Sequence, residues 1–141
     1  MLDSVQDPGV ARIVALLRAA RPQLDADGKA MDRASSGELY GPGEAYIDLG
    51  DAIAKMRKDI RSLRASVVAQ TGRTPAAASA RDLTAQTLLE TDQSFEKLAQ
   101  ATDTADPTAA TALRDESFRL LSQAAVTSVK AGTALGIPWP L

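Results

Sequence analysis

The sequence predicts an all-α protein that folds as an up-down-up-down antiparallel four-helix bundle. Ala supplies much of the 45% hydrophobic content and aromatic residues reach only 4%, a composition that favours close helix packing over sheets. No stretch shows the convincing period-two alternation of a strand. Gly and Pro residues divide the 141-residue chain into four long segments of similar length. Short connections between such segments make consecutive helices antiparallel neighbours, so we expect one bundle domain over residues 1–141.

The first helix is predicted over residues 8–35, kinked near Pro22. Asp7 can cap the free amides of a helix start, and Pro8 fits the first turn. Seven-residue apolar steps from Val10 to Met31 favour one continuing axis, although Pro22 could also end the helix.

The second helix is predicted over residues 43–71, between Gly43 and Gly72. Its apolar residues alternate spacings of three and four, as in a helix packed lengthwise against neighbours. They are Leu49, Ile53, Met56, Ile60, Leu63 and Val67.

The third and fourth helices are predicted over residues 75–104 and 107–135. Each begins with a capping residue followed by proline, Thr74-Pro75 and Asp106-Pro107. Gly136 suits a left-handed helix end, and a short apolar tail follows it. The buried face of the fourth helix is predicted to carry Ala110, Leu113, Ser117, Leu121, Ala124, Ser128, Ala131 and Leu135.

Composition narrows the chemistry that the chain can perform. It contains no His and no Cys, so the commonest general base, the usual transition-metal ligands and the thiolate nucleophile are missing. No loop has the acidic spacing of a calcium site, and we expect no metal and no cofactor. A net charge of −2 argues against nucleic-acid binding.

The chain also lacks the patterns of membrane insertion and export. No apolar run approaches the roughly 20 residues that span a bilayer, and no signal-peptide pattern opens the sequence. The chain as given is therefore expected to be cytoplasmic, unless a leader has been removed. Abundant Ala, Arg, Asp and Thr with sparse Lys resembles proteins of high-GC bacteria or their phages.

Two apolar patches are candidate partner-binding sites. The tail holds Ile137, the only Trp of the chain at position 139 (Trp139), and Leu141. It either folds back over the bundle or serves as a hook for a partner, because Trp is enriched among interface anchors. Leu39 and Tyr40, in a loop rich in Gly, form the second patch.

The basic run on the second helix is a candidate site for a small anion. Lys55, Lys58, Arg61 and Arg64 could bind phosphate or another anionic ligand. The alternative is that these cations pair with acidic residues of the third helix. Hydroxyls predicted in the helix seams likewise either line a cavity for a polar ligand or bond to their own helix. The residues concerned are Thr91, Thr102, Ser117 and Ser128.

Three functions remain open. The first is a non-catalytic bundle that acts through protein–protein contacts or self-association, as an assembly component, adaptor or accessory factor. The second is a sensor-type bundle that binds a small anionic or polar ligand. The third is a small all-α enzyme that uses Arg, Lys and Glu on an anionic substrate. The segment from Lys55 to Arg73 is similar to the first helix of all-α chorismate mutases, but no second block matches, so no site residues are implied.

Overall fold

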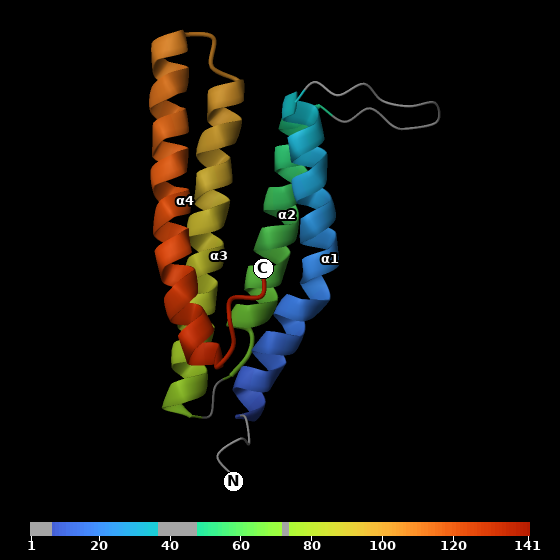
Figure 1. The fold of residues 1–141 in the computed structure, drawn as a ribbon, viewed down its shortest axis with the longest axis vertical. Coiled ribbons are helices and arrows are strands. Elements are labelled where there is room, and N and C mark those ends of the chain that lie inside the picture. The colour runs from blue at the N-terminus through green and yellow to red at the C-terminus, as the bar shows by residue number, and fades with distance from the viewer. Residues whose placement is uncertain (1–6, 37–47, 72–73) are drawn as a thin grey trace, which may run out of the picture.

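The computed structural model describes residues 7–36, 48–71 and 74–141. Within these residues it contains four α-helices and no strand, which confirms the predicted all-α class. The helices are α1 (Pro8–Ser36), α2 (Leu49–Val68), α3 (Pro75–Thr102) and α4 (Pro107–Leu135). Consecutive helices run antiparallel, and the connection between α2 and α3 joins two helix pairs, α1 with α2 and α3 with α4 (Figure 1).

Capping side chains set three of the helix starts at their predicted positions. The Asp7 carboxylate accepts from the Gly9 amide at 2.8 Å, and the Thr74 hydroxyl accepts from the Ala77 amide at 3.1 Å. At the start of α4, the Asp106 carboxylate accepts from the Ala109 amide. These oxygens satisfy amides that have no partner within their own helix.

The first helix is continuous, as predicted. Pro22 lies inside α1, and the helix passes through Asp27 and Gly28, a pair that often forms turns. Its axis changes direction near the middle (Figure 1), which is the usual effect of a proline that removes one backbone hydrogen bond.

The predicted bounds of α2 and α3 were wrong by a few residues. Asp48 has extended backbone and caps the amide of Asp51, so α2 begins at Leu49 rather than at position 43. Residues 43–47 lie outside the described residues. The helix ends at Val68 instead of 71, and α3 ends at Thr102 instead of 104, where Asp103 leaves the regular helix.

The main core lies between α1, α2 and α3. The predicted α2 seam is confirmed, since all five of its residues from Ile53 to Val67 are buried. They pack with α1 residues such as Ile13 and Leu17 and with Leu88 of α3. Removal of these side chains from water supplies most of the stability of a bundle of this kind.

The bundle is open between its first and last helices. α4 makes most of its contacts with α3 and few with α1, whereas a closed bundle would pack α4 against both. The α3–α4 seam is built from small residues, and there the Ser117 hydroxyl donates to the Ser94 carbonyl at 2.8 Å. Small side chains let the two helix backbones approach closely, so α4 is held mainly by a single neighbour.

Candidate functional site

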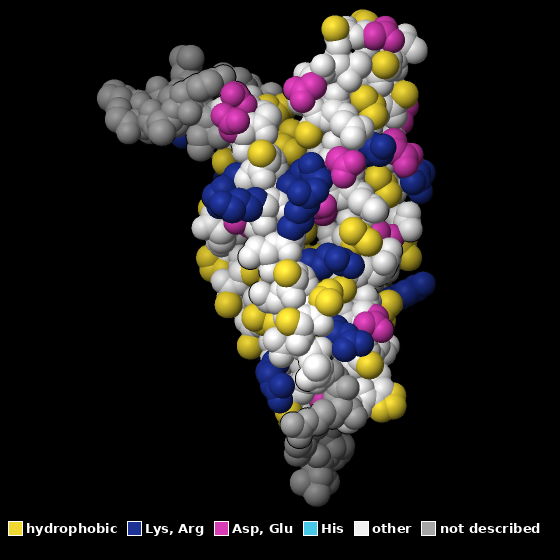
Figure 2. Space-filling model, turned by 180° about the vertical axis from the view of Figure 1, so that it is seen from behind, with side chains coloured by type: hydrophobic (Ala, Val, Ile, Leu, Met, Phe, Trp, Pro, Cys, Tyr) yellow, Lys and Arg dark blue, Asp and Glu magenta, His cyan; other side chains and the backbone are white. Residues whose placement is uncertain are grey.

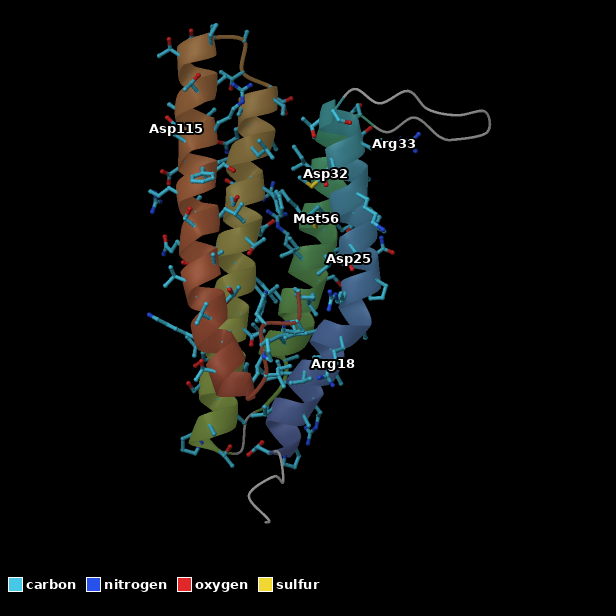
Figure 3. All side chains as sticks on the ribbon, in the orientation of Figure 1. Arg18, Asp25, Asp32, Arg33, Met56 and Asp115 are labelled. Carbon is cyan, nitrogen blue, oxygen red and sulfur yellow. The ribbon has the colours of Figure 1, made fainter. Side chains whose placement is uncertain are left out.

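A groove opens where the two helix pairs meet. It has a volume of about 370 Å³ and is lined by residues of all four helices and of the C-terminal tail. Met56 of α2, labelled in Figure 3, forms part of its lining together with Phe95 of α3, Leu121 of α4 and Trp139 of the tail. The groove therefore follows directly from the separation of α4 from α1.

Apart from the Asp25 carboxylate at its edge, the surface of the groove is mainly apolar, because its hydroxyl groups donate within their own helices. Thr87 donates to the Leu83 carbonyl at 2.9 Å, and Thr91 donates to the Thr87 carbonyl at 2.8 Å. Ser128 donates to its own helix at 2.7 Å. Such bonds leave methyl groups and aromatic rings as the main contact surface.

Three of the four seam hydroxyls follow the second of the two predicted alternatives, bonding to their own helix. Thr91 and Ser128 bond to their own helices, and so does Thr102, which donates to the Ala99 carbonyl at 2.7 Å. Ser117 instead bonds across the seam to Ser94. These hydroxyls serve the packing of the helices.

The C-terminal tail folds back onto the bundle. Gly136 adopts a left-handed φ of 75°, and the Ile137 amide donates to the Gly132 carbonyl at 3.1 Å. The tail then turns back across the space between the helix pairs (Figure 1), with Ile137 and Trp139 packed against the core. Of the three tail residues predicted to bind a partner, Leu141 is the most exposed, at 37%.

This return of the chain requires a glycine one turn before the helix end. A β-carbon on Gly132 would lie 2.9 Å from the Ile137 carbonyl oxygen and 3.1 Å from the Trp139 nitrogen. Both are backbone atoms that cannot move aside independently. Gly132 therefore permits the tail to cross α4 closely.

A set of large apolar side chains on α4 faces solvent. Phe118 is 72% exposed, Val129 69%, Val126 61% and Leu121 44%. We call Phe118, Val126 and Val129 the outer α4 face; Leu121 lies at its border and lines the groove. The prediction that Leu121 is buried was wrong, because the α3–α4 seam uses the adjacent Leu120, which is buried. Phe118 and Val129 were not predicted as site residues, although their eleven-residue separation places them on one side of a helix.

The basic run of α2 is partly occupied by carboxylates of α3. The Arg57 Nε lies 3.0 Å from Asp92 and its Nη2 lies 3.1 Å from Glu96. Arg61 reaches the other oxygen of Asp92 at 3.1 Å, and Arg64 donates to the Ala85 carbonyl at 3.1 Å. Figure 2 shows Lys and Arg side chains running down the middle of this face, with Asp and Glu beside the upper ones.

The four predicted anion ligands do not form one cluster. Arg61 and Arg64 line a shallow depression between α2 and α3, together with Asp92 and Glu96. Lys55 instead points to carboxylates on the α1 side, and Lys58 is exposed. Anion binding by this set stays a prediction.

A pair of neighbouring carboxyls, the buried Asp27 of α1 and the partly exposed Asp59 of α2, lies between these two helices. Asp27 is 4% exposed, accepts from the Gln23 amide nitrogen at 3.0 Å and lies 3.5 Å from the Lys55 ammonium. Burial, and then the neighbouring Asp59 carboxyl, raises the pKa of Asp27 above its ordinary value of 3.8. The pKa of Asp59 is lowered, first by a hydrogen bond that the protonated Asp27 carboxyl can donate to it and then by the Lys55 ammonium. These opposite shifts predict that the contact between α1 and α2 responds to pH.

A second buried acid lies on α3. Glu90 is only 2% exposed, one turn before Ser94 of the α3–α4 seam. Within the part of the chain that the structure describes, its Oε1 has no hydrogen-bond partner.

Three further questions raised by the sequence concern the second apolar patch, metal binding and membrane insertion. Leu39 and Tyr40 lie outside the described residues. In residues 7–36, 48–71 and 74–141 no group of three acidic side chains is placed to hold a metal ion. Over the same ranges, none of the helices combines the length and the hydropathy that crossing a membrane needs.

Comparison with protein-family models, with curated proteins and with solved structures finds no match to this chain. The geometry of the groove, the tail and the outer α4 face is therefore what supports a function.

Proposed function

We propose that the protein is a non-catalytic assembly component, adaptor or accessory factor that acts through protein–protein contacts, with the outer α4 face as its contact surface. The observation that carries this proposal is the exposure of Phe118, Val126 and Val129, each more than 60% exposed. Isolated apolar residues are common on surfaces, but a row of them along one helix is typical of interaction sites.

The charge distribution around this face supports the same proposal. From position 120 to the end of the chain, the sequence contains one charged side chain, Lys130. The centres of protein interfaces are depleted in charged residues and enriched in aromatic ones such as Phe118. Figure 3 places Asp115 on the side of α4 that faces away from α1 and α2, so charged groups border this face at its N-terminal end.

The tail, one of the two patches that the sequence offered for partner binding, is less suited to be the contact surface. Trp139 and Ile137 pack against the core, and their release would expose apolar surface that the folded chain buries. The outer α4 face is already exposed and needs no rearrangement.

The test is site-specific photo-crosslinking in the cells that naturally make the protein. A photoreactive phenylalanine analogue at position 118 should give one adduct of defined mass. The matched control places the same analogue at Ala112, which is exposed on the same helix but lies outside the outer α4 face. Equal labelling from both positions, or no adduct from position 118, would contradict the proposal.

The groove supports a second candidate function, the binding of a small apolar molecule. Its volume of about 370 Å³ falls in the usual range of ligand sites, about 300–1,000 Å³. Because its hydroxyls are bonded internally, an uncharged apolar ligand suits this groove better than the anionic or polar one that the sequence suggested. Titration with 1-decanol should change Trp139 fluorescence saturably, and Ser128→Leu, which narrows the groove, should abolish the change. A linear, non-saturating response would argue against this function.

A further inference from the structure

We infer that the depression between α2 and α3 is a binding site for a small oxyanion that carries an apolar group, as phenyl phosphate does. This site shares only Ile60 with the lining of the groove and lies apart from the outer α4 face, so the inference goes beyond the proposed function. The depression has a volume of about 430 Å³. Its donors are Arg61 and Arg64 of α2 and Gln93 of α3.

The two arginines present unused donors at the depression. Arg61 donates from its Nε to Asp92 at 3.1 Å, and Arg64 donates from its Nε to the Ala85 carbonyl at 3.1 Å. Over residues 7–36, 48–71 and 74–141, no hydrogen bond engages the Nη groups of either side chain. A guanidinium is planar, so a bond at Nε restricts its orientation and leaves two Nη groups that can bind an oxyanion.

The charges at the depression leave one cation without a carboxylate. Arg57, Arg61 and Arg64 meet only two acids there, Asp92 and Glu96. Both oxygens of Asp92 accept bonds, from Arg57 and from Arg61, and Glu96 accepts one from Arg57. In the part of the chain that the structure describes, Arg64 therefore has no acidic partner and is bonded only to a carbonyl.

The wider surroundings keep the same sign of charge. Residues 57–64 and 81–97 together contain six cationic and five acidic side chains, whichever way they face. Two of these acids lie away from the depression. Asp59 pairs with Lys55, and Glu90 lies about 160° around α3 from Asp92. The potential at the depression is therefore positive, as an anion site requires.

The apolar part of the lining indicates the rest of the ligand. Val68 is 48% exposed and lines the depression together with Ile60, Ala65 and Leu89. An inorganic anion would leave this surface uncovered. An aromatic ring would cover it, and a ring also stacks favourably on a guanidinium. The lining thus favours an aryl-substituted anion over a bare one.

The exposure of the site determines its expected affinity. Water and salt screen charges at an open surface, and the Asp92 carboxylate beside Arg61 opposes an incoming anion. We therefore expect phenyl phosphate to bind with a dissociation constant in the millimolar range, and more weakly as the salt concentration rises.

An NMR titration of the ¹⁵N-labelled protein with phenyl phosphate tests the inference. The side-chain signals of Arg64 and Gln93 should shift saturably. Arg64→Gln should raise the dissociation constant by about fivefold or more, whereas Arg114→Gln, which removes the same charge from an exposed position on α4, should leave it unchanged. Arg64→Lys keeps the charge but not the planar group, and should also weaken binding. Circular dichroism establishes that the variants fold.

A second comparison tests the apolar half of the site. Inorganic phosphate should bind more weakly than phenyl phosphate, and Val68→Ser should reduce this difference without changing the affinity for inorganic phosphate. Inorganic phosphate that binds as tightly as phenyl phosphate would overturn the assignment of an apolar substituent.

Two results would overturn the site itself. One is equal binding of phenyl phosphate by Arg64→Gln and Arg114→Gln. The other is that phenol, which lacks the anionic group, produces the same shifts as phenyl phosphate, because the ring alone would then account for binding. Neither result bears on the outer α4 face, which the photo-crosslink at position 118 tests separately.

Discussion

The hydroxyl of Thr74 donates a hydrogen bond to the carboxylate of Asp7 at 2.7 Å. Thr74 caps α3 and Asp7 caps α1, so one bond joins the starts of two helices that are far apart in the sequence. Each side chain also accepts from an amide of its own helix. The N-terminal ends of α1 and α3 are therefore fixed relative to each other by the hydrogen bond between their two capping residues.

Thr74→Ala should lower the free energy of unfolding by about 1 kcal/mol, because it removes the α3 cap and the bond to Asp7. Thr74→Ser keeps the hydroxyl and should restore most of the loss. Urea denaturation at neutral pH measures both variants. An Ala variant as stable as the wild type would show that the shared cap does not stabilise the fold.

The same contact predicts how stability changes in acid. The bond from Thr74, followed by the Gly9 amide, lowers the pKa of Asp7 below 3.8. A carboxyl whose pKa is lower in the folded state contributes stability above its unfolded pKa and loses it as the pH falls through the folded value. The difference between Thr74→Ala and the wild type should therefore shrink below pH 3.8.

Asp27→Asn should raise the free energy of unfolding at neutral pH by about 1 kcal/mol, since it removes a buried charge while keeping the shape of the side chain. For the wild type, the raised pKa of Asp27 means that the folded state holds a proton that the unfolded state has released. Its stability should therefore fall as the pH rises from 3.8 through the raised pKa.

Denaturation curves at several pH values check the effect of Asp27→Asn. In the variant, the fall in stability over this pH interval should disappear. Asp25→Asn on the same helix is the control, because Asp25 is 62% exposed and only loosely paired with Arg21 at 3.7 Å. If Asp27→Asn destabilises the protein at neutral pH, the ionised carboxylate is a favourable partner of Lys55, and our interpretation of the pair is wrong.

Asp92→Asn should destabilise the protein by about 1–3 kcal/mol, because it breaks two charge-assisted bonds between α2 and α3. Asp92 accepts from Arg57 at 3.0 Å and from Arg61 at 3.1 Å, and its side chain is only 9% exposed. Asp25→Asn again provides the exposed comparison and should change stability by less than about 0.5 kcal/mol. Equal effects of the two substitutions would show that the bonds of Asp92 to Arg57 and Arg61 stabilise the protein no more than an exposed ion pair does.

Gly132→Ala should displace the C-terminal tail, although Ala is normally the better helix former by about 1 kcal/mol. The new β-carbon would meet the Ile137 carbonyl oxygen at 2.9 Å. Because Trp139 is the only Trp, its emission should shift to longer wavelength and its quenching by acrylamide should increase. Gly28→Ala is the matched control, since its β-carbon would meet only the flexible end of Met56, at 3.8 Å. That variant should be more stable, with unchanged fluorescence.

The sequence was sufficient to predict the helices where local chemistry determines them. The starts at Pro8, Pro75 and Pro107 and the end before Gly136 are confirmed, because a capping residue beside a proline, or a glycine in a left-handed conformation, acts within a single turn. The start of α2 was wrong because Asp48, inside the predicted helix, is the cap that begins it.

The sequence was not sufficient to predict which side of α4 packs against α3. Leu120 and Leu121 are adjacent, and a pattern of threes and fours fits either one as the buried residue. The predicted four-helix bundle is confirmed, but within it α4 packs mainly on α3 and makes few contacts with α1. The exposure of Phe118 follows from this tertiary arrangement, which helix periodicity does not determine.

The close α3–α4 seam determines how the molecule can change shape. Small buried side chains such as Ser94 and Ser117 leave little room for the two helices to slide, so we expect this hairpin to move as a rigid body. The ion pairs of Asp92 tie α3 to α2, whereas α1 and α4 have few contacts. Rotation about the α2–α3 contact would thus widen or narrow the groove mainly at the end away from the bond between Thr74 and Asp7, while every helix keeps its internal geometry.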